Sequence, residues 1–250
     1  MQRDYFKIEK NSGDFPYYAG DPQKLTIVQW LSLVLVLLAQ FWIMSTATLS
    51  FLPKGIATAL MDIFLVGVPM GLLWWFTKHA IGALFKPLKW RDTLTIIKYV
   101  LLMVVIGLGS TIALNLIGQT TNGDVAGDQV TGLVGYLAVF LDNILSLFWE
   151  ELISLIPLLA MMAGLKALGV SRKISIILST IVTSILFGAL HLPSYQWNVP
   201  MVFTSIVFLR LILDVLYLKT KNIWLTYVTH LLYDSFVFAL PLIFGLIFKH

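Results

Sequence analysis

Two acidic side chains stand inside an apolar run at Phe148-Trp149-Glu150-Glu151-Leu152-Ile153-Ser154-Leu155. The run extends from about residue 130 to 168 and carries no Lys or Arg within a helical turn of the glutamates. An ionised acid at the centre of a bilayer costs roughly 2.5–3.5 kcal/mol on insertion scales, so it faces a partner, a cavity or a reaction. We therefore expect the partners of Glu150 and Glu151 to come from other parts of the chain.

The composition surrounding this stretch is that of a membrane protein. The chain has 250 residues, of which 58% are hydrophobic and 12% charged, and its mean hydropathy is +0.87. Soluble domains carry about 25% charged residues. The composition therefore predicts an all-α fold, a polytopic transmembrane helical bundle in the cell membrane. Cysteine is absent, which excludes disulfides and Cys-ligated metals.

The apolar runs divide the chain into three expected parts. Residues 1–24 form a polar tail of mixed charge, which we expect to be exposed to solvent and which lacks the apolar core of a signal peptide. Residues 25–129 hold N-terminal transmembrane helices, and residues 130–250 hold a C-terminal core that also spans the membrane. The net charge of +4 comes from Lys and Arg that cluster between apolar runs, a pattern of membrane topology and not of nucleic-acid binding.

The stretch 130–168 determines how many spans are expected. As one helix it would be about 60 Å long at 1.5 Å per residue, against a hydrocarbon core of about 30 Å. Two helices with a break near residues 142–148 give eight spans, whereas one tilted helix gives seven. Seven spans place the basic loops on the side of the N-terminus, which would then be cytoplasmic. Length favours eight and charge favours seven, so about eight helices (seven to eight) are expected.

Three more ionisable residues lie within or at the ends of C-terminal apolar runs: His191, His230 and Asp234. His230 and Asp234 are four residues apart and share one helical face. A membrane interior that gathers acids and histidines suits general acid–base chemistry. It also suits a relay for protons or ions.

In order, Glu150-Glu151, Phe187-x-x-x-His191 and His230-x-x-x-Asp234 resemble the three-motif signature of the CAAX-protease and bacteriocin-processing family, also called the Abi family. The resemblance covers about residues 140–240 and implies an intramembrane endopeptidase. It implies that Glu150 deprotonates a water that His191 orients, that Glu151 supports it, and that His230 and Asp234 lie across the cavity.

The sequence departs from the family pattern at one position, because the arginine of the first motif falls at Leu155. Either catalysis is impaired or another cation replaces that arginine, and Arg210 is the candidate. Arg210 lies four residues before Asp214, and this spacing favours a pair that neutralises itself within one span.

The cofactor remains open at this level. His191, His230 and Glu150 are the ligand types that zinc or another divalent metal takes, and such an ion would activate the water. A metal-free glutamate mechanism is equally compatible with the same residues. The implied partners are a peptide or membrane-protein substrate and the lipid bilayer, with no nucleic acid.

Three functions are consistent with these residues. The first is an intramembrane endopeptidase, for which the resemblance suggests bacteriocin immunity or peptide processing. The second is a proton- or ion-coupled transporter, in which the same acids and histidines form a relay. The third is a non-catalytic immunity or scaffold protein that keeps the fold.

Overall fold

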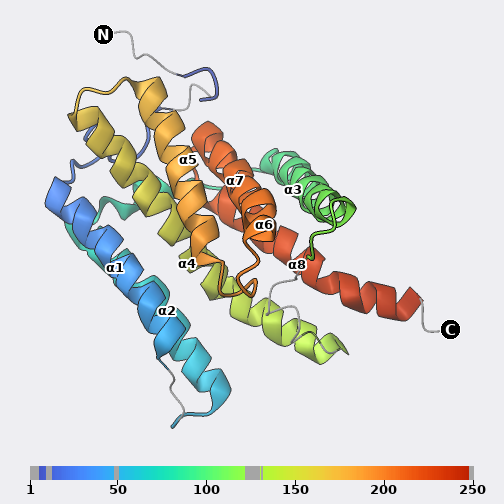
Figure 1. Ribbon diagram of the computed structural model, residues 1–250. Helices are drawn as coiled ribbons and strands as arrows, with labels where there is room; N and C mark the ends of the chain where they lie inside the picture. The colour runs from blue at the N-terminus through green and yellow to red at the C-terminus, as the bar shows by residue number, and fades with distance from the viewer. Residues whose placement is uncertain (1–5, 10–12, 48–50, 122–129, 131, 248–250) are drawn as a thin grey trace.

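The computed structural model describes residues 6–9, 13–47, 51–121, 130 and 132–247, and this part of the chain is helical without strands (Figure 1). Seven of its helices are long and apolar enough to cross a membrane. The all-α polytopic bundle is therefore confirmed, at the lower end of the expected seven to eight spans. The division between residues 129 and 130 stays a prediction. The spans are α1 (Ile27–Thr46), α2 (Lys54–Phe76), α3 (Asp92–Leu116), α4 (Gly132–Ala167), α5 (Arg172–Leu190), α6 with α7 (Val199–Met201 and Val207–Thr220) and α8 (Ile223–Ile247).

Helix α4 is one continuous helix of 36 residues, so the break considered near residues 142–148 is absent. At 1.5 Å per residue it is about 54 Å long. Figure 1 shows it running obliquely through the bundle, where it contacts α1, α2, α5 and α8. The oblique path lets one helix exceed the membrane thickness and still keep the basic segments on one side.

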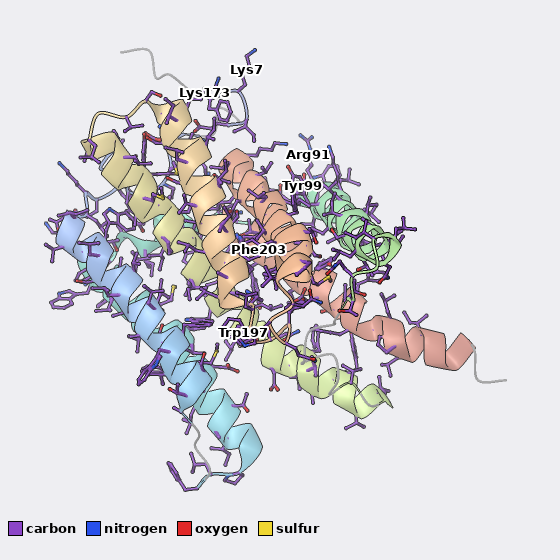
Figure 2. The ribbon with its side chains drawn as sticks, viewed as in Figure 1. Lys7, Arg91, Tyr99, Lys173, Trp197 and Phe203 are labelled. Atoms are coloured by element: carbon purple, nitrogen blue, oxygen red, sulfur yellow. The ribbon has the colours of Figure 1, made fainter. Side chains whose placement is uncertain are left out.

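The two ends of the bundle differ in charge. One end, here called the basic end, contains residues 77–91, 168–171 and 221–222 together with the N-terminal segment. Figure 2 places Lys7, Arg91 and Lys173 there, with Trp197 toward the opposite end. The basic end also holds Lys78, Lys86, Lys89, Lys166, Arg172, Lys219 and Lys221. In the described connections of the opposite, neutral end (residues 47, 51–53, 117–121 and 191–198), Lys and Arg are absent, and Lys54 begins α2 beside them.

The N-terminal segment packs against the basic end, which corrects the expectation of a solvent-exposed tail. Phe15 and Tyr17 are buried, with 1% and 2% of their surface exposed. The Arg172 guanidinium donates hydrogen bonds of 2.8 and 2.6 Å to the Glu9 carboxylate, and the Lys221 ammonium lies 3.4 Å from it. Glu9 thus joins the start of α5 to the turn between α7 and α8, because the buried Lys221 and the largely enclosed Arg172 both need an anion there.

Close packing at two glycines brings the helices of the C-terminal half together. A Cβ added to Gly188 of α5 would lie 2.5 Å from Cγ2 of Val207 in α7. A Cβ added to Gly107 of α3 would lie 2.7 Å from the Tyr233 hydroxyl of α8. A π-helical turn at residues 202–206 precedes α7 next to the first contact. These contacts hold α3, α5, α7 and α8 around the polar cluster described next.

Candidate active site

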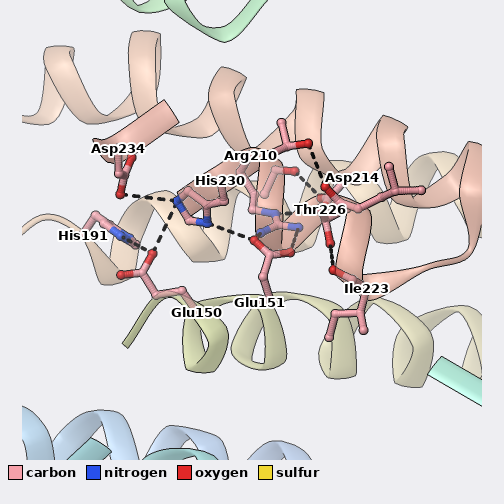
Figure 3. A network of polar contacts seen from close by, with 12 residues as sticks. Glu150, Glu151, His191, Arg210, Asp214, Ile223, Thr226, His230 and Asp234 are labelled. Carbon is pink, nitrogen blue, oxygen red and sulfur yellow. Dashed lines mark hydrogen bonds and ion pairs between the residues drawn. The ribbon is translucent and has the colours of Figure 1, made fainter. Parts of the chain in front are cut away.

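Adjacent positions on α4 give the two glutamates different surroundings. Consecutive helical residues are about 100° apart around the axis. Figure 3 shows both side chains leaving α4 toward the neighbouring helices, Glu150 toward His191 and Glu151 toward Arg210. The Glu150 side chain keeps 22% of its surface exposed, whereas Glu151 keeps 1%. One carboxylate is therefore accessible and the other is enclosed.

Glu150 lies between two histidines. Its Oε2 is 3.5 Å from Nε2 of His191, the residue that follows α5, and 3.9 Å from Nε2 of His230 in α8. Nδ1 of His191 lies 2.8 Å from the Phe187 carbonyl oxygen. A carbonyl only accepts, so this contact places a proton on Nδ1 and leaves Nε2 of the neutral ring as an acceptor. The carboxylate and the imidazole can therefore hold one water between them.

Glu151 is fixed by an enclosed ion-pair network. Two guanidinium nitrogens of Arg210 donate to its carboxylate oxygens at 2.9 and 3.3 Å. Nδ1 of His230 lies 2.9 Å from Oε1, and this contact orients the ring so that Nε2 faces Glu150. Nε of Arg210 donates to Asp214 at 2.9 Å, and the Ser184 hydroxyl donates to the other oxygen of Asp214 at 2.9 Å. Both oxygens of each carboxylate are thus occupied.

Arg210 supplies the cation that the first motif lacks. Leu155 is buried in the hydrophobic core, and no charge comes from its position. The guanidinium enters instead from α7 and binds Glu151 in the two-pronged geometry that suits a carboxylate. Arg210 pairs with Asp214 as expected. The expectation that the two residues neutralise only each other is wrong, because the same guanidinium also binds the Glu151 carboxylate.

Asp234 completes the cluster from α8. Its Oδ2 lies 3.8 Å from Nε2 of His230, one turn earlier on the same helix. Its side chain keeps 21% of its surface exposed, close to the value for Glu150. The structure therefore brings all five predicted site residues into one cluster, and their chemical roles stay predictions.

A cavity of about 460 Å³ opens beside the cluster, between α3, α7 and α8. Glu150, His191, His230 and Asp234 lie on its wall. Most of the remaining wall is apolar, with Met103, Leu108, Ile206, Leu209, Leu213, Val237 and Leu240 among its residues. A space of this size and lining accepts an apolar segment and presents it to a few polar groups.

The sequence did not predict two supporting features of the cluster. Asp214 was expected to pair only with Arg210, and nothing in the sequence pointed to Ser184, since a serine inside a span is common. The contact between Ser184 and Asp214 depends on how α5 and α7 are rotated about their axes, which the sequence does not reveal. A single arginine inside a span together with more than one buried acid was the available hint.

The donor types of the cluster suit a metal ion. Within the described ranges, no group of three His, Asp or Glu side chains is placed to hold a metal ion. Nδ1 of each histidine is engaged, by Phe187 in one case and by Glu151 in the other, and such contacts are also how a metal-ligating histidine is oriented. The proposed metal ligands His191, His230 and Glu150 therefore stay a prediction, and no step below uses a metal.

The fold and the site together define a polytopic helical membrane protein that gathers acids and histidines inside its bundle. Residues 132–236, from the start of α4 to just beyond Asp234, match the family model described as type II CAAX prenyl endopeptidase Rce1-like. The resemblance drawn from the three motifs is thereby confirmed for this part of the chain. No curated protein and no solved structure gives a significant match.

Proposed function

We propose that this protein is an intramembrane endopeptidase that hydrolyses a peptide bond in a peptide or a membrane-associated protein segment. One observation carries the proposal: Glu150 is an accessible carboxylate with Nε2 of two histidines within 4 Å, beside an apolar cavity. Its neighbour Glu151 is fully engaged and fixes the second histidine. Such an arrangement suits a general base held next to a bound segment.

In the proposed reaction Glu150 takes a proton from a water that His191 orients through Nε2. The water oxygen attacks the carbonyl carbon of the scissile bond and forms a tetrahedral intermediate. His230, held by Glu151 and Asp234, is protonated on both ring nitrogens in this step and donates from Nε2 to the developing oxyanion. The carbon–nitrogen bond then breaks, and Glu150 returns its proton to the leaving amine. The products are a carboxylic acid and an amine, which become a carboxylate and an ammonium when the acid's proton moves to the amine, and no redox partner is needed.

The orientation proposed is that of a multi-pass protein of the cell membrane with its basic end, including the N-terminus, in the cytoplasm. The uneven distribution of Lys and Arg between the two ends supports it. The motif resemblance supports a biological role in peptide processing or bacteriocin immunity. Both cavities of the site lie toward the neutral end, which supports access from one face more than alternating access by a transporter.

The decisive experiment replaces Glu150 by glutamine, which keeps the shape of the side chain and removes its basicity. Purified protein in proteoliposomes is incubated with membrane-associated peptides, and the products are identified by mass spectrometry. We expect Glu150→Gln to reduce cleavage by at least about 100-fold, because general base catalysis contributes 10²–10⁴-fold. Asp62→Asn is the matched control, since Asp62 is also a buried acid of a span but lies on α2.

Unimpaired cleavage would contradict the proposed role of Glu150. Cleavage by Glu150→Gln at the wild-type rate would show that another group is the base. A transporter would instead show a pH-dependent uptake that Glu150→Gln and His191→Ala both abolish, without any cleaved product.

A further inference from the structure

A second cavity meets the first at the catalytic cluster. It has a volume of about 280 Å³ and lies between α1, α4 and the residues that follow α5. The two cavities share Glu150, Phe187, His191, Asp234 and Phe238. Glu150 is therefore reached from two directions, and the chemistry of the two approaches differs.

The wall of the smaller cavity contains a buried hydrogen-bond donor that has no partner among the described residues. Nδ2 of Asn143 is buried and has no hydrogen-bond partner among the described residues. Buried amide donors are almost always paired, with protein or with an ordered water. Asn143 precedes Glu150 by seven residues, so it lies on the same face of α4, about 10 Å away along the axis. The unpaired donor thus lies along an approach to the catalytic carboxylate.

Three serines complete this wall with acceptors. The hydroxyls of Ser45, Ser146 and Ser194 each donate to a backbone carbonyl, at 2.8, 3.0 and 3.0 Å. A hydroxyl that donates in this way still has lone pairs to accept a hydrogen bond. Donor and acceptor groups therefore occur together in a cavity large enough for several waters.

Both cavities lie at the neutral end of the bundle. The smaller one is lined by the C-terminal end of α1 and by Pro193 and Ser194. The larger one is lined by Thr121, Tyr195 and the start of the α6–α7 span. Neither lining includes residues 77–91, 168–171 or 221–222 of the basic end. By the charge rule, the neutral end is the face opposite the cytoplasm.

We propose that the smaller cavity is a water-filled access route, lined by Asn143 and the three serines, that supplies the hydrolytic water to Glu150 from the non-cytoplasmic face. The apolar cavity then receives the substrate segment, and substrate and water reach Glu150 along different routes. This inference rests on the proposed function, since the water that the route supplies is the one consumed by hydrolysis.

The absence of cysteine makes the route directly testable. Ser45→Cys, Ser146→Cys and Ser194→Cys are near-isosteric and add one thiol each. Intact cells are treated with a small, charged, membrane-impermeant methanethiosulfonate reagent. Because only a hydrated thiol forms the reactive thiolate, these variants should react about ten-fold or more faster than Leu35→Cys, which faces lipid on α1.

A second control establishes the side of the membrane. Thr93→Cys places an exposed thiol in the first turn of α3 at the basic end, so it should react in inverted membrane vesicles and not in intact cells. Cavity thiols that react no faster than Leu35→Cys would overturn the water route. Cavity thiols that react only in inverted vesicles would overturn its opening on the non-cytoplasmic face.

The kinetic test uses Asn143→Leu, which replaces the amide with an apolar group of similar size. Loss of one water-binding donor, worth about 1.4 kcal/mol, should lower kcat about ten-fold and leave KM unchanged. A rise in KM at unchanged kcat would show that Asn143 binds substrate, and would overturn the assignment. The labelling does not require activity, so reactive cavity thiols in a protein that cleaves nothing would sink the proposed function and leave the access route standing.

Discussion

Replacing Arg210 by methionine tests the enclosed network that holds the site. The arginine side chain has 1% of its surface exposed and makes three close N–H···O contacts, two with Glu151 and one with Asp214. Methionine retains an unbranched apolar stem but no charge. Two buried carboxylates would then lose their cation while most of the packing around the stem stays.

The expected cost follows from those contacts. Removing one partner of a buried ion pair costs about 3–5 kcal/mol, because the remaining charge is left uncompensated. Glu151 keeps its contact with His230 and Asp214 keeps Ser184, so the two losses should not add fully. For a chain of this size the loss corresponds to a fall in Tm on the order of 10 °C. Thermal unfolding of the detergent-solubilised protein measures it.

Two companion variants separate the contributions of the two acids. If Arg210 served only Asp214, the double variant Arg210→Met with Asp214→Asn would return to nearly wild-type stability. We expect it to stay destabilised, because Glu151 still lacks its cation. Leu155→Arg in the Arg210→Met background places a guanidinium one turn beyond Glu151 and should restore part of the stability. A Tm for Arg210→Met within about 2 °C of wild type, or less than 1 kcal/mol, would refute the reasoning.

Three further predictions concern the rest of the molecule. Glu9→Gln should lower stability by about 1–3 kcal/mol, because Arg172 loses one of its two charged acceptors at the basic end; thermal unfolding checks it, and an unchanged Tm would show that the charge of Glu9 does not help to anchor α5. Gly188→Ala should cost about 1–3 kcal/mol by overpacking against Val207, whereas Gly109→Ala, which meets no atom within 4 Å, should be neutral or stabilising by up to about 1 kcal/mol. Chelator dialysis should leave the cleavage rate unchanged if the glutamate mechanism holds, and activity that is lost and then restored by zinc would show a metal.

The sequence predicted the cluster because an ionisable group in lipid is too costly to leave without a partner. Glu150, Glu151, His191, His230 and Asp234 were therefore expected to face the bundle interior, and they meet there. Helical spacing was sufficient for His230 and Asp234, since four residues make one turn. The convergence of all five residues on one cavity was implied by the resemblance of the three motifs, since spacing alone relates only His230 to Asp234.

The sequence could not predict contacts that depend on the rotation and tilt of whole helices. Hydropathy gave the length of the stretch 130–168 but not its tilt, so one oblique α4 and two shorter helices were both compatible. Phe15 is buried against cations from two distant segments, Arg172 at the start of α5 and Lys221 at the end of α7. The second partner of Arg210 likewise lies 59 residues away in sequence, on a helix whose facing side no local pattern reveals.

Glu150 and Glu151 are consecutive acids on a membrane helix, and each needs its own compensating partners. Glu151 pairs with Arg210, whereas Glu150 faces His191 and His230. Arg210 and His230 engage both oxygens of Glu151, whose side chain is 1% exposed, so this carboxylate is not available to a substrate. Glu150 thereby has a neutralised neighbour, which lowers the cost of carrying its own charge at the cavity wall. Arg210 therefore supports the proposed base without touching it, through the carboxylate between them. A cation at position 155 would lie one turn from Glu151 on α4, so Arg210 provides from another helix the contact that the resemblance assigns to that position.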